Sequence, residues 1–510
     1  MENLDVLFVN PGGSRLVYQG LSDKISAIES PTWALLLAQS CRSVGYKVGI
    51  LDMNAEKLTY EEGLERITAL NPRLICFVVY GQNVNSGTVS MSGAVQFSEF
   101  LKESKVSAPI SYVGSYVQAL PKKTLIDESS IDFVFMNEGV YALRNILKTN
   151  IDLNDLGGIK GIAWRKNGEV VFNEPEIVVP TERMDVDLPG YAWDLLPFKE
   201  RALDMYRSPL WHAEYDEEKR SPYAALQTSL GCRFGCSFCM INILNRNDND
   251  EIGVAGNYSN MRFWSPEFII KEFDKLVEMG VETIRIVDEM FLLYKKHYLP
   301  LCEGLALKSY ANNLRLWSYS RVDTVTNPDF LKIVRSAGIR WLCLGIESAD
   351  KSVRLEVSKG KFEDVDIYKV VEQVHKADID IMANYIVGLP GDTDQSMAKT
   401  FELSTELMTA GWNMYAAMAL PGSELYAKAK SNGTELPAKY TGYSFHSVDT
   451  LPLPTNTLSP SEILKFRDEA FVLYHSNPQF LKLIQSKFGE SATENIKDML
   501  KVKLTRNILE

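Results

Sequence analysis

Long apolar runs and basic clusters are what this 510-residue sequence lacks. No stretch approaches the roughly 20 apolar residues that cross a bilayer. The opening residues, MENLDVLFVNPGG, carry neither the basic segment nor the cleavage site of a signal peptide. The net charge is −12, and no block of lysine and arginine is interleaved with aromatic residues, which argues against nucleic-acid binding. We therefore expect a cytoplasmic protein with no membrane span and no nucleic-acid partner.

Cysteine is also scarce, and its count of seven is odd, so the chain is not a disulfide scaffold. Four cysteines stand singly among apolar residues, where a free thiol usually behaves as a small buried hydrophobic group; they are Cys41, Cys76, Cys302 and Cys343. The other three, Cys232, Cys236 and Cys239, fall within eight residues. Such a cluster requires a chemical explanation.

Residues 4–148 alternate near-continuous apolar runs with amphipathic segments, which predicts an α/β domain with a doubly wound parallel sheet. Such sheets bind ligands beyond the carboxyl ends of their strands. The residues at those ends are small or polar: Asn10, Gly12, Gly81, Gln82, Asn83, Gly114, Glu138 and Gly139. They suit the close approach of a large flat ligand or a phosphate, but on local sequence alone ordinary strand-to-helix turns are the favoured explanation.

The chain beyond residue 150 changes character. Asn167-Gly168 is a two-residue turn signal that predicts a hairpin, followed by a linker rich in proline and aromatic residues. Six strand–helix units after residue 221 predict a partial (β/α)6 barrel, whose chemistry would lie at the carboxyl ends of its strands. The remainder is mostly helical. We expect domains at 1–150, 221–425 and 426–510, with the hairpin and linker at 151–220.

The segment GCRFGCSFCMIN places three thiols at the spacing C-x3-C-x2-C, just after a predicted strand. A zinc site normally needs four ligands, and neither a second cysteine pair nor a nearby histidine is present in the sequence. Three close thiolates suit three irons of a 4Fe-4S cluster, with the fourth iron left open. Zinc and incidentally adjacent core cysteines remain the alternatives.

The same spacing, with the aromatic Phe238 before the last cysteine, resembles the signature of the radical S-adenosylmethionine (radical SAM) superfamily. The resemblance implies that Cys232, Cys236 and Cys239 hold the cluster and that its open iron chelates S-adenosylmethionine. It implies that one electron then cleaves this ligand to a 5′-deoxyadenosyl radical. It also implies a small-molecule substrate and an electron donor of the flavodoxin or ferredoxin type.

The resemblance extends over residues 222–425, where strand ends match the family segments that contact S-adenosylmethionine. It assigns the methionine ammonium to Asp288 and Glu289, and the methionine carboxylate to Ser320 and Arg321. It assigns the ribose to Glu347 and Ser348, and the adenine to the segment containing Gly388.

A flavodoxin-like sheet before such a barrel resembles the cobalamin-binding subfamily of radical SAM proteins. The resemblance implies that cobalamin contacts the strand-end residues of the first domain given above. One motif departs from cobalamin domains of the methionine synthase type, which use D-x-H-x-x-G to coordinate cobalt. The first histidine here is His212, so residues 1–211 cannot supply that ligand.

The leading hypothesis is a cobalamin-dependent radical SAM methyltransferase that acts on an unactivated carbon of a metabolite. A radical SAM rearrangement, dehydration, cyclisation or oxidation without cobalamin is the alternative. A non-catalytic iron–sulfur or zinc scaffold is the alternative from another class. The sequence singles out no acid, base or radical relay. His446, in the aromatic-rich stretch YTGYSFHSVDT after the barrel, is compatible with a structural role and with a place at the barrel mouth.

Overall fold

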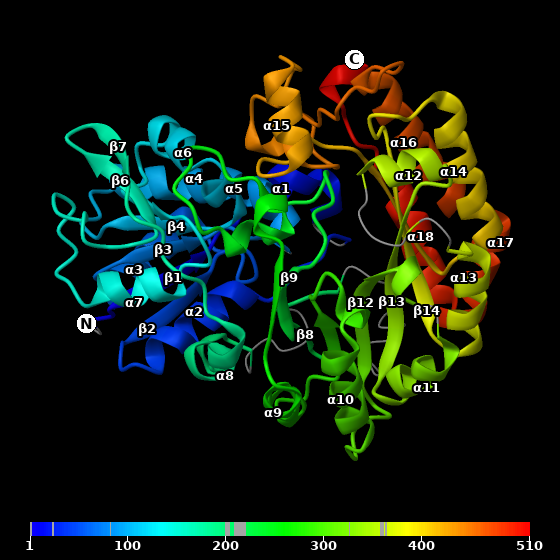
Figure 1. Ribbon diagram of the computed structural model, residues 1–510, viewed down its shortest axis with the longest axis horizontal. Coiled ribbons are helices and arrows are strands. Elements are labelled where there is room, and N and C mark those ends of the chain that lie inside the picture. Colours follow the sequence, from blue (N-terminus) through cyan, green and yellow to red (C-terminus); the bar gives the residue numbers. More distant parts are fainter. Residues whose placement is uncertain are drawn as a thin grey trace.

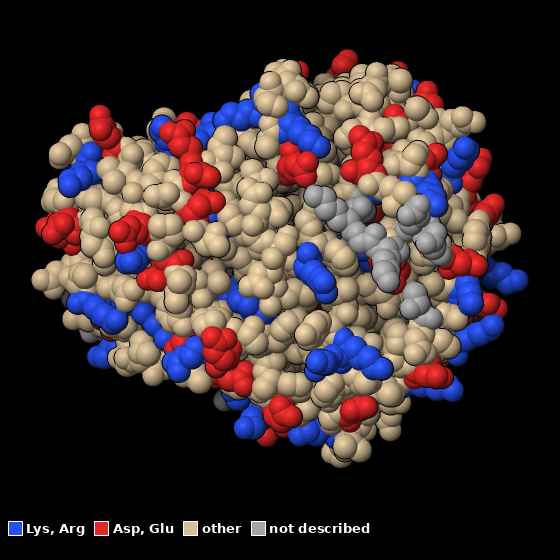
Figure 2. Space-filling view, viewed as in Figure 1, with Lys and Arg blue, Asp and Glu red and all other residues tan. Residues whose placement is uncertain are grey.

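The computed structural model contains two sheets that lie side by side, with the chain running from the left sheet to the right in Figure 1. It describes residues 3–22, 25–81, 83–198, 205–208, 221–325, 327–357, 362 and 365–510. Among these residues, no helix is both long and apolar enough to cross a membrane. Acidic and basic side chains are interspersed on the face shown in Figure 2.

The N-terminal sheet has the order β2-β1-β3-β4-β5-β6-β7, and its first five strands are parallel. Those strands are β1 (Val6–Asn10), β2 (Val48–Asp52), β3 (Ile75–Val78), β4 (Ile110–Val113) and β5 (Phe133–Phe135). The connecting helices are α1 (Ser14–Tyr18), α2 (Thr32–Arg42), α3 (Tyr60–Leu70), α4 (Gly87–Glu103), α5 (Ser115–Ala119), α6 (Pro121–Asp127) and α7 (Val140–Leu147). The central strands are buried on both faces, which explains their continuous apolar runs.

The predicted hairpin is present as β6 (Ile162–Lys166) and β7 (Glu169–Phe172). Its turn residues Asn167 and Gly168 have φ angles of 52° and 85°, the left-handed conformation that this turn type requires. The hairpin adds two antiparallel strands to the edge of the N-terminal sheet, beyond β5. It therefore extends the sheet as well as leading into the linker.

The second sheet is the partial barrel, with six parallel strands in the order β15-β14-β13-β12-β11-β8. Its strands are β8 (Tyr223–Leu226), β11 (Thr283–Ile286), β12 (Arg315–Arg321), β13 (Ile339–Glu347), β14 (Asp380–Val387) and β15 (Gly411–Ala416). Its helices are α9 (Pro266–Glu278), α10 (Lys295–Ala306), α11 (Pro328–Ser336), α12 (Lys351–Val357), α13 (Ile367–Lys376) and α14 (Asp394–Leu407). The predicted six-stranded half-barrel is confirmed.

Side chains alternate between the two faces of the barrel sheet, as the pleat of a strand requires. One face is covered by helices and fully buried, as at Tyr385 and Trp412. The other face carries half-exposed side chains, including Tyr319, Asn384 and Tyr415. This second face is the open interior of the barrel.

The apolar segment YAALQTSLG at residues 223–231 predicts one continuous strand at the start of the barrel, and the structure differs from this prediction. The structure divides them into β8 and a separate β9 (Ser229–Cys232), which pairs antiparallel with β10 (Asn260–Phe263). The buried Asp288 carboxylate binds the chain at the break: it accepts from the Thr228 N–H and hydroxyl at 2.6 Å each and from the Ser229 hydroxyl at 2.5 Å. The chain is thereby turned out of the sheet before the first cysteine.

The C-terminal region begins with a helix between the two sheets, at the top centre of Figure 1, and continues with helices on the outer side of the barrel. It contains α15 (Glu424–Ser431), α16 (Pro460–His475), α17 (Pro478–Phe488) and α18 (Glu490–Lys501). Ser459 and Glu462 form the capping box that starts α16. Tyr474 of α16 stacks on Trp412 of β15 with ring centroids 4.9 Å apart. This contact anchors α16 to the covered face of the sheet.

Candidate active site at the barrel mouth

The three clustered cysteines lie at the end of β9 and in the loop after it. Cys232 is buried, whereas Cys236 and Cys239 are half-exposed. The side chain of Asn242 braces the loop, since its oxygen accepts from the Cys232 N–H at 2.7 Å and its amide donates to the Phe234 oxygen at 3.0 Å. Among the described residues, no group of three histidine, cysteine or carboxylate side chains is arranged to hold a single metal ion.

Burial is the main cause that raises the pKa of Cys232, to about 12, and the neighbouring Cys236 adds to it. A cation at this loop would lower that pKa. Arg321 partly supplies one: its guanidinium lies 3.9 Å from Cys236 Sγ. Burial thus favours the neutral thiol of Cys232, and the positive charge of Arg321 acts against that effect.

Asn85, in the loop after β3, is a contact that the sequence did not reveal. Its oxygen accepts from the Met240 N–H at 2.9 Å, and its amide lies 3.7 Å from Cys239 Sγ. The N-terminal sheet therefore touches the cysteine loop directly. No motif marks Asn85, because the partner is far away in sequence.

Phe238, which is half-buried, packs against Val353, Val357, Leu389 and Ala417 at the barrel mouth. Next to it, the Ser237 N–H donates to the Val357 oxygen at 2.9 Å. The aromatic residue of the motif thus anchors the cysteine loop to the ends of later barrel strands.

Arg321 ends β12 inside the barrel. Its guanidinium pairs with Asp323 at 2.5 Å and stacks over the rings of Phe234 and Phe362, at 4.2 and 4.7 Å from the centroids. Ser320, on the opposite face, exchanges a hydrogen bond with Thr324 at 2.8 Å. The structure thus places Arg321 beside the cysteines and turns Ser320 away from the barrel interior.

The two adjacent acids after β11 have different surroundings. The Asp288 carboxylate accepts hydrogen bonds from Thr228 and Ser229. Burial raises its pKa to about 6, although these hydrogen bonds act to lower it. Glu289 has no hydrogen-bond partner among the described residues, and burial raises its pKa to about 7. Glu289 is therefore the acid available to a ligand, while Asp288 shapes the chain before the cysteines.

Glu347 lies at a register shift in β13, between Gly345 and Glu347, with a φ of 65°. A non-glycine residue in this conformation is uncommon and marks local strain. Burial raises the pKa of Glu347 to about 7, while Arg321 opposes the shift. The irregularity turns this carboxylate toward the same mouth as Arg321.

Ser348 and Gly388 have structural contacts. The Ser348 hydroxyl lies 3.2 Å from that of Thr400. Gly388 has a φ of 77°, and a Cβ there would lie 2.6 Å from Ile463 of α16. Gly388 thus lets the strand end approach the C-terminal helix closely.

At the ends of β1 and β3, the N-terminal sheet lines a pocket. Its walls include Asn10, Gly12, Gly81, Tyr18 and Glu29. The Asn10 amide donates to Asp52 at 2.8 Å. Among the other strand-end candidates, Asn83 caps a short helical turn before α4, and Gln82 lies outside the described residues.

Gly114 follows β4 with a φ of 157°, and a Cβ there would lie 2.3 Å from the Val79 oxygen. Three polar side-chain atoms near this point are buried with no hydrogen-bond partner among the described residues: Thr88 Oγ1, Ser115 Oγ and Gln118 Oε1. Buried polar atoms are normally paired. This end of the sheet therefore offers unused hydrogen-bonding capacity, and the sequence did not single out these three residues.

Glu138 has a structural partner. Its carboxylate forms a buried ion pair with Arg262 of β10 at 2.6 Å and accepts from the Val179 N–H at 2.5 Å. Gly139 begins α7 in the left-handed conformation, with its N–H bonded to Asn137. Glu138 thus joins the N-terminal sheet to β10, which pairs with the strand that carries Cys232.

Proteins similar to this chain in sequence and in fold include radical SAM enzymes. Residues 226–404 match the model of the radical SAM superfamily. An uncharacterised methyltransferase of Pyrococcus horikoshii is 24% identical over 459 residues, which cover 90% of each chain. The radical S-adenosylmethionine methyltransferase TsrM from Kitasatospora setae, solved with cobalamin and a [4Fe-4S] cluster, superposes with a TM-score of 0.65 at 14% identity, over 98% of this chain and 99% of that one.

A second solved structure shares the fold. The cobalamin-dependent S-adenosylmethionine radical enzyme OxsB, solved with aqua-cobalamin and S-adenosylmethionine, superposes with a TM-score of 0.64 at 14% identity, over 98% of this chain and 75% of that one. Both structures therefore share the arrangement of an N-terminal sheet followed by a half-barrel. The chain is therefore an enzyme, and its residues 226–404 match the radical SAM superfamily.

Proposed function

We propose that this protein is a cobalamin-dependent radical SAM methyltransferase that acts on a carbon centre of a small molecule. The observation that carries the proposal is the direct contact of the N-terminal sheet region with the cysteine loop, through Asn85, and with the neighbouring β10, through the Glu138–Arg262 ion pair. A site for a radical and a site for a second large cofactor thus lie against each other. The methyltransferases among the similar proteins support the same reaction class.

The barrel residues fit a cluster and S-adenosylmethionine. Cys232, Cys236 and Cys239 would hold three irons, and three thiolates are the donor set that such clusters use. Glu289, Arg321 and Glu347 bring both signs of charge to the same mouth, which suits a ligand with ammonium, carboxylate and hydroxyl groups. Asp288 would act indirectly, by holding Thr228 and Ser229 in place.

The strand ends of the N-terminal sheet fit a large amide-rich ligand such as cobalamin. The pocket at these strand ends is lined by Asn10, Gly12 and Gly81, and Thr88, Ser115 and Gln118 keep unpaired polar atoms. The cobalt would have no histidine ligand from residues 1–211, where the sequence has none.

In the proposed reaction the protein binds and orients the cofactors and the substrate, and it shields them from water. When bound, the cluster and S-adenosylmethionine supply a radical that abstracts hydrogen, and cobalamin supplies the methyl group. Arg321, stacked between two aromatic rings, fixes a positive charge beside Cys236. The apolar contacts of Phe238 help to exclude water from the mouth. We also propose that a cytoplasmic flavodoxin- or ferredoxin-type protein donates the electron.

The test is anaerobic reconstitution of the full chain with iron, sulfide and hydroxocobalamin, followed by S-adenosylmethionine and a reductant. We expect corrin absorbance that persists through gel filtration, and formation of 5′-deoxyadenosine. Cys236→Ala should abolish the second product, whereas Cys302→Ala, a thiol of α10 outside the site, should retain it. Formation of 5′-deoxyadenosine without bound corrin would contradict methyl transfer and favour a radical reaction that does not use cobalamin.

A further inference from the structure

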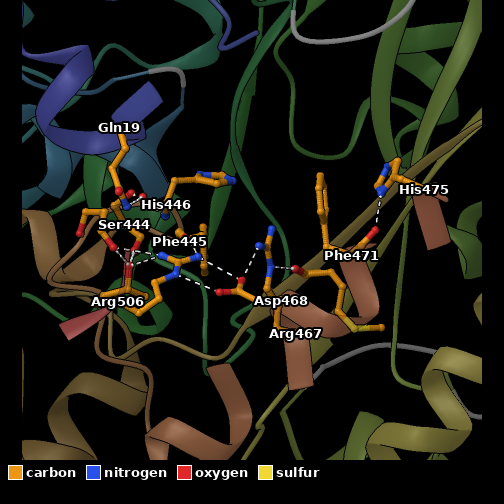
Figure 3. A network of polar contacts seen from close by, with 12 residues as sticks. Gln19, Ser444, Phe445, His446, Arg467, Asp468, Phe471, His475 and Arg506 are labelled. Atoms are coloured by element: carbon orange, nitrogen blue, oxygen red, sulfur yellow. Dashed lines mark hydrogen bonds and ion pairs between the residues drawn. The ribbon is translucent and has the colours of Figure 1, made fainter. Parts of the chain in front are cut away.

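Residues 444–450, which we call the closing loop, are held in place by the C-terminal segment of the chain (Figure 3). The Arg506 guanidinium donates to the backbone oxygens of Phe445 and Ser447 at 2.9 and 3.0 Å. Its remaining N–H groups bind both carboxylate oxygens of Asp468 on α16, at 2.9 and 3.0 Å. Because a planar guanidinium directs its donors rigidly, Arg506 fixes the conformation of the closing loop.

Gln19 attaches the closing loop to the N-terminal sheet region. Its amide donates to the His446 oxygen at 2.7 Å and to the Thr505 oxygen at 3.1 Å, and its own oxygen accepts from the Thr505 N–H at 3.1 Å. The Ser444 hydroxyl donates to the Val17 oxygen at 3.0 Å. The loop is therefore fixed from the N-terminal and the C-terminal side at once.

Two side chains of the closing loop face the site. The Phe445 ring lies 5.0 Å from that of Tyr415, on the open interior of the barrel. The His446 ring lies 5.5 Å from that of Tyr18, which lines the pocket at the ends of β1 and β3. The loop thus lies between the barrel interior and the pocket at the N-terminal strand ends.

His446 has hydrogen-bonding capacity that the protein does not use. Its side chain is half-buried, and neither ring nitrogen has a hydrogen-bond partner in the part of the chain that the structure describes. Burial, with the nearby charges of Arg467 and Arg506, holds the pKa of His446 well below its ordinary value. The neutral imidazole offers one donor and one acceptor.

The barrel interior near the loop is polar, and each buried arginine near the loop is ion-paired. The Asn413 amide donates to the Asn384 oxygen at 3.1 Å, and the Asn413 oxygen has no partner among the described residues. The buried Arg285 is paired with Glu29 at 2.6 Å. Burying a second, unpaired charge in such a space is costly, whereas an uncharged polar group finds donors and acceptors.

We propose that His446 is a substrate-contacting residue that binds an uncharged polar group, such as a carboxamide, on a ring-containing substrate. Phe445 and Tyr415 supply the aromatic surface for the ring, and Arg506 is the positioning residue that holds His446 in place. The inference rests on the proposed function, since it identifies this space as the substrate chamber.

The first test compares two fragments of the same shape, benzamide and benzoate, by saturation-transfer NMR with the reconstituted full chain. Benzamide should bind more tightly than benzoate. His446→Ala should weaken benzamide binding about fivefold, the effect of one lost hydrogen bond. His375→Ala, an exposed histidine on α13, is the matched control and should bind as the wild type does.

The second test concerns Arg506. Arg506→Ala should weaken benzamide binding by the same factor as His446→Ala, and the double variant should show no further loss, because both changes remove one interaction. Hydrogen–deuterium exchange should rise in peptides covering residues 444–450 and stay unchanged in β13. Lys501→Ala, a surface change on α18, is the control. If Arg506→Ala does not fold, Gln19→Ala removes the other anchor and should give the same result.

Equal or tighter binding of benzoate would overturn the assignment of substrate class. Unchanged benzamide affinity in His446→Ala would overturn the contact, and additive losses in the double variant would overturn the positioning role. None of these measurements requires cleavage of S-adenosylmethionine. A protein that binds benzamide as expected but forms no 5′-deoxyadenosine therefore disproves the proposed function alone.

Discussion

The two sheets present opposite kinds of surface to the site between them. The barrel mouth is built from charged and sulfur-bearing side chains with defined partners, such as Arg321 beside Asp323 and Cys236. The facing edge of the N-terminal sheet is lined by small and polar residues such as Asn10 and Gly12, and nearby polar side-chain atoms are unpaired. Charged and sulfur-bearing residues at a fixed spacing form a recognisable sequence motif. Small and polar residues at strand ends resemble ordinary turns and form only a weak one.

Removing Glu138 should have the largest effect on the contact between the two sheets, because this residue links them. Glu138→Ala leaves Arg262 buried without its carboxylate partner, and we expect a loss of about 4 kcal/mol in the free energy of unfolding. Urea denaturation measures it. Glu251→Ala, which removes an exposed pair with Lys122, should change it by less than about 1 kcal/mol. A small effect of Glu138→Ala would mean that the sheets are joined elsewhere.

The buried Asp52 on β2 should make the stability of the N-terminal sheet depend on pH. Burial raises its pKa from 3.8 to about 6, against hydrogen bonds from Ala55, Asn10 and Tyr206. A raised carboxyl pKa means that the folded state binds the proton more tightly, so stability falls as the pH rises from about 4 to about 6. The expected contribution is about 3 kcal/mol. Asp52→Asn should remove this part of the pH dependence in urea melts recorded across that range, and an unchanged slope would refute the assignment.

Glu347 tests the barrel surface. Glu347→Gln removes a negative charge close to Arg321 while keeping the side chain's size. We expect S-adenosylmethionine to bind about tenfold more weakly, measured by calorimetry on the reconstituted protein, because a charge-assisted hydrogen bond becomes a neutral one. Glu356→Gln, on the exposed face of α12, is the control and should bind normally. Equal affinity in the two variants would remove Glu347 from the ligand site.

Removing the Asn85 side chain should have the smallest effect of the four changes. Asn85→Ala removes the acceptor of the Met240 N–H, and we expect a loss of about 1 kcal/mol in stability. Hydrogen–deuterium exchange should show the change in the cysteine loop and not in β12. A change spread over the whole barrel would mean that Asn85 acts on global stability only.

Local pattern predicts the strands and the cysteine loop, because apolar periodicity and C-x3-C-x2-C lie within short stretches of chain. It does not predict partners that meet only in three dimensions. Asp288 belongs to a family motif by position, yet its carboxylate holds Thr228 and Ser229. Glu138 follows a strand as a ligand residue would, yet it pairs with Arg262. Nothing in the short stretches around Asn85 or Arg506 reveals that one reaches the cysteines and the other fixes the closing loop.

The position of Thr505 and Arg506 also sets an order of assembly during synthesis. These residues are made after every other element of the chamber, so Gln19 and the closing loop gain their last partners only when the C-terminal segment emerges. Until then both sheets can fold while the space between them stays accessible. Loading of large cofactors before the final residues dock, and retention afterwards, would follow from chain order alone.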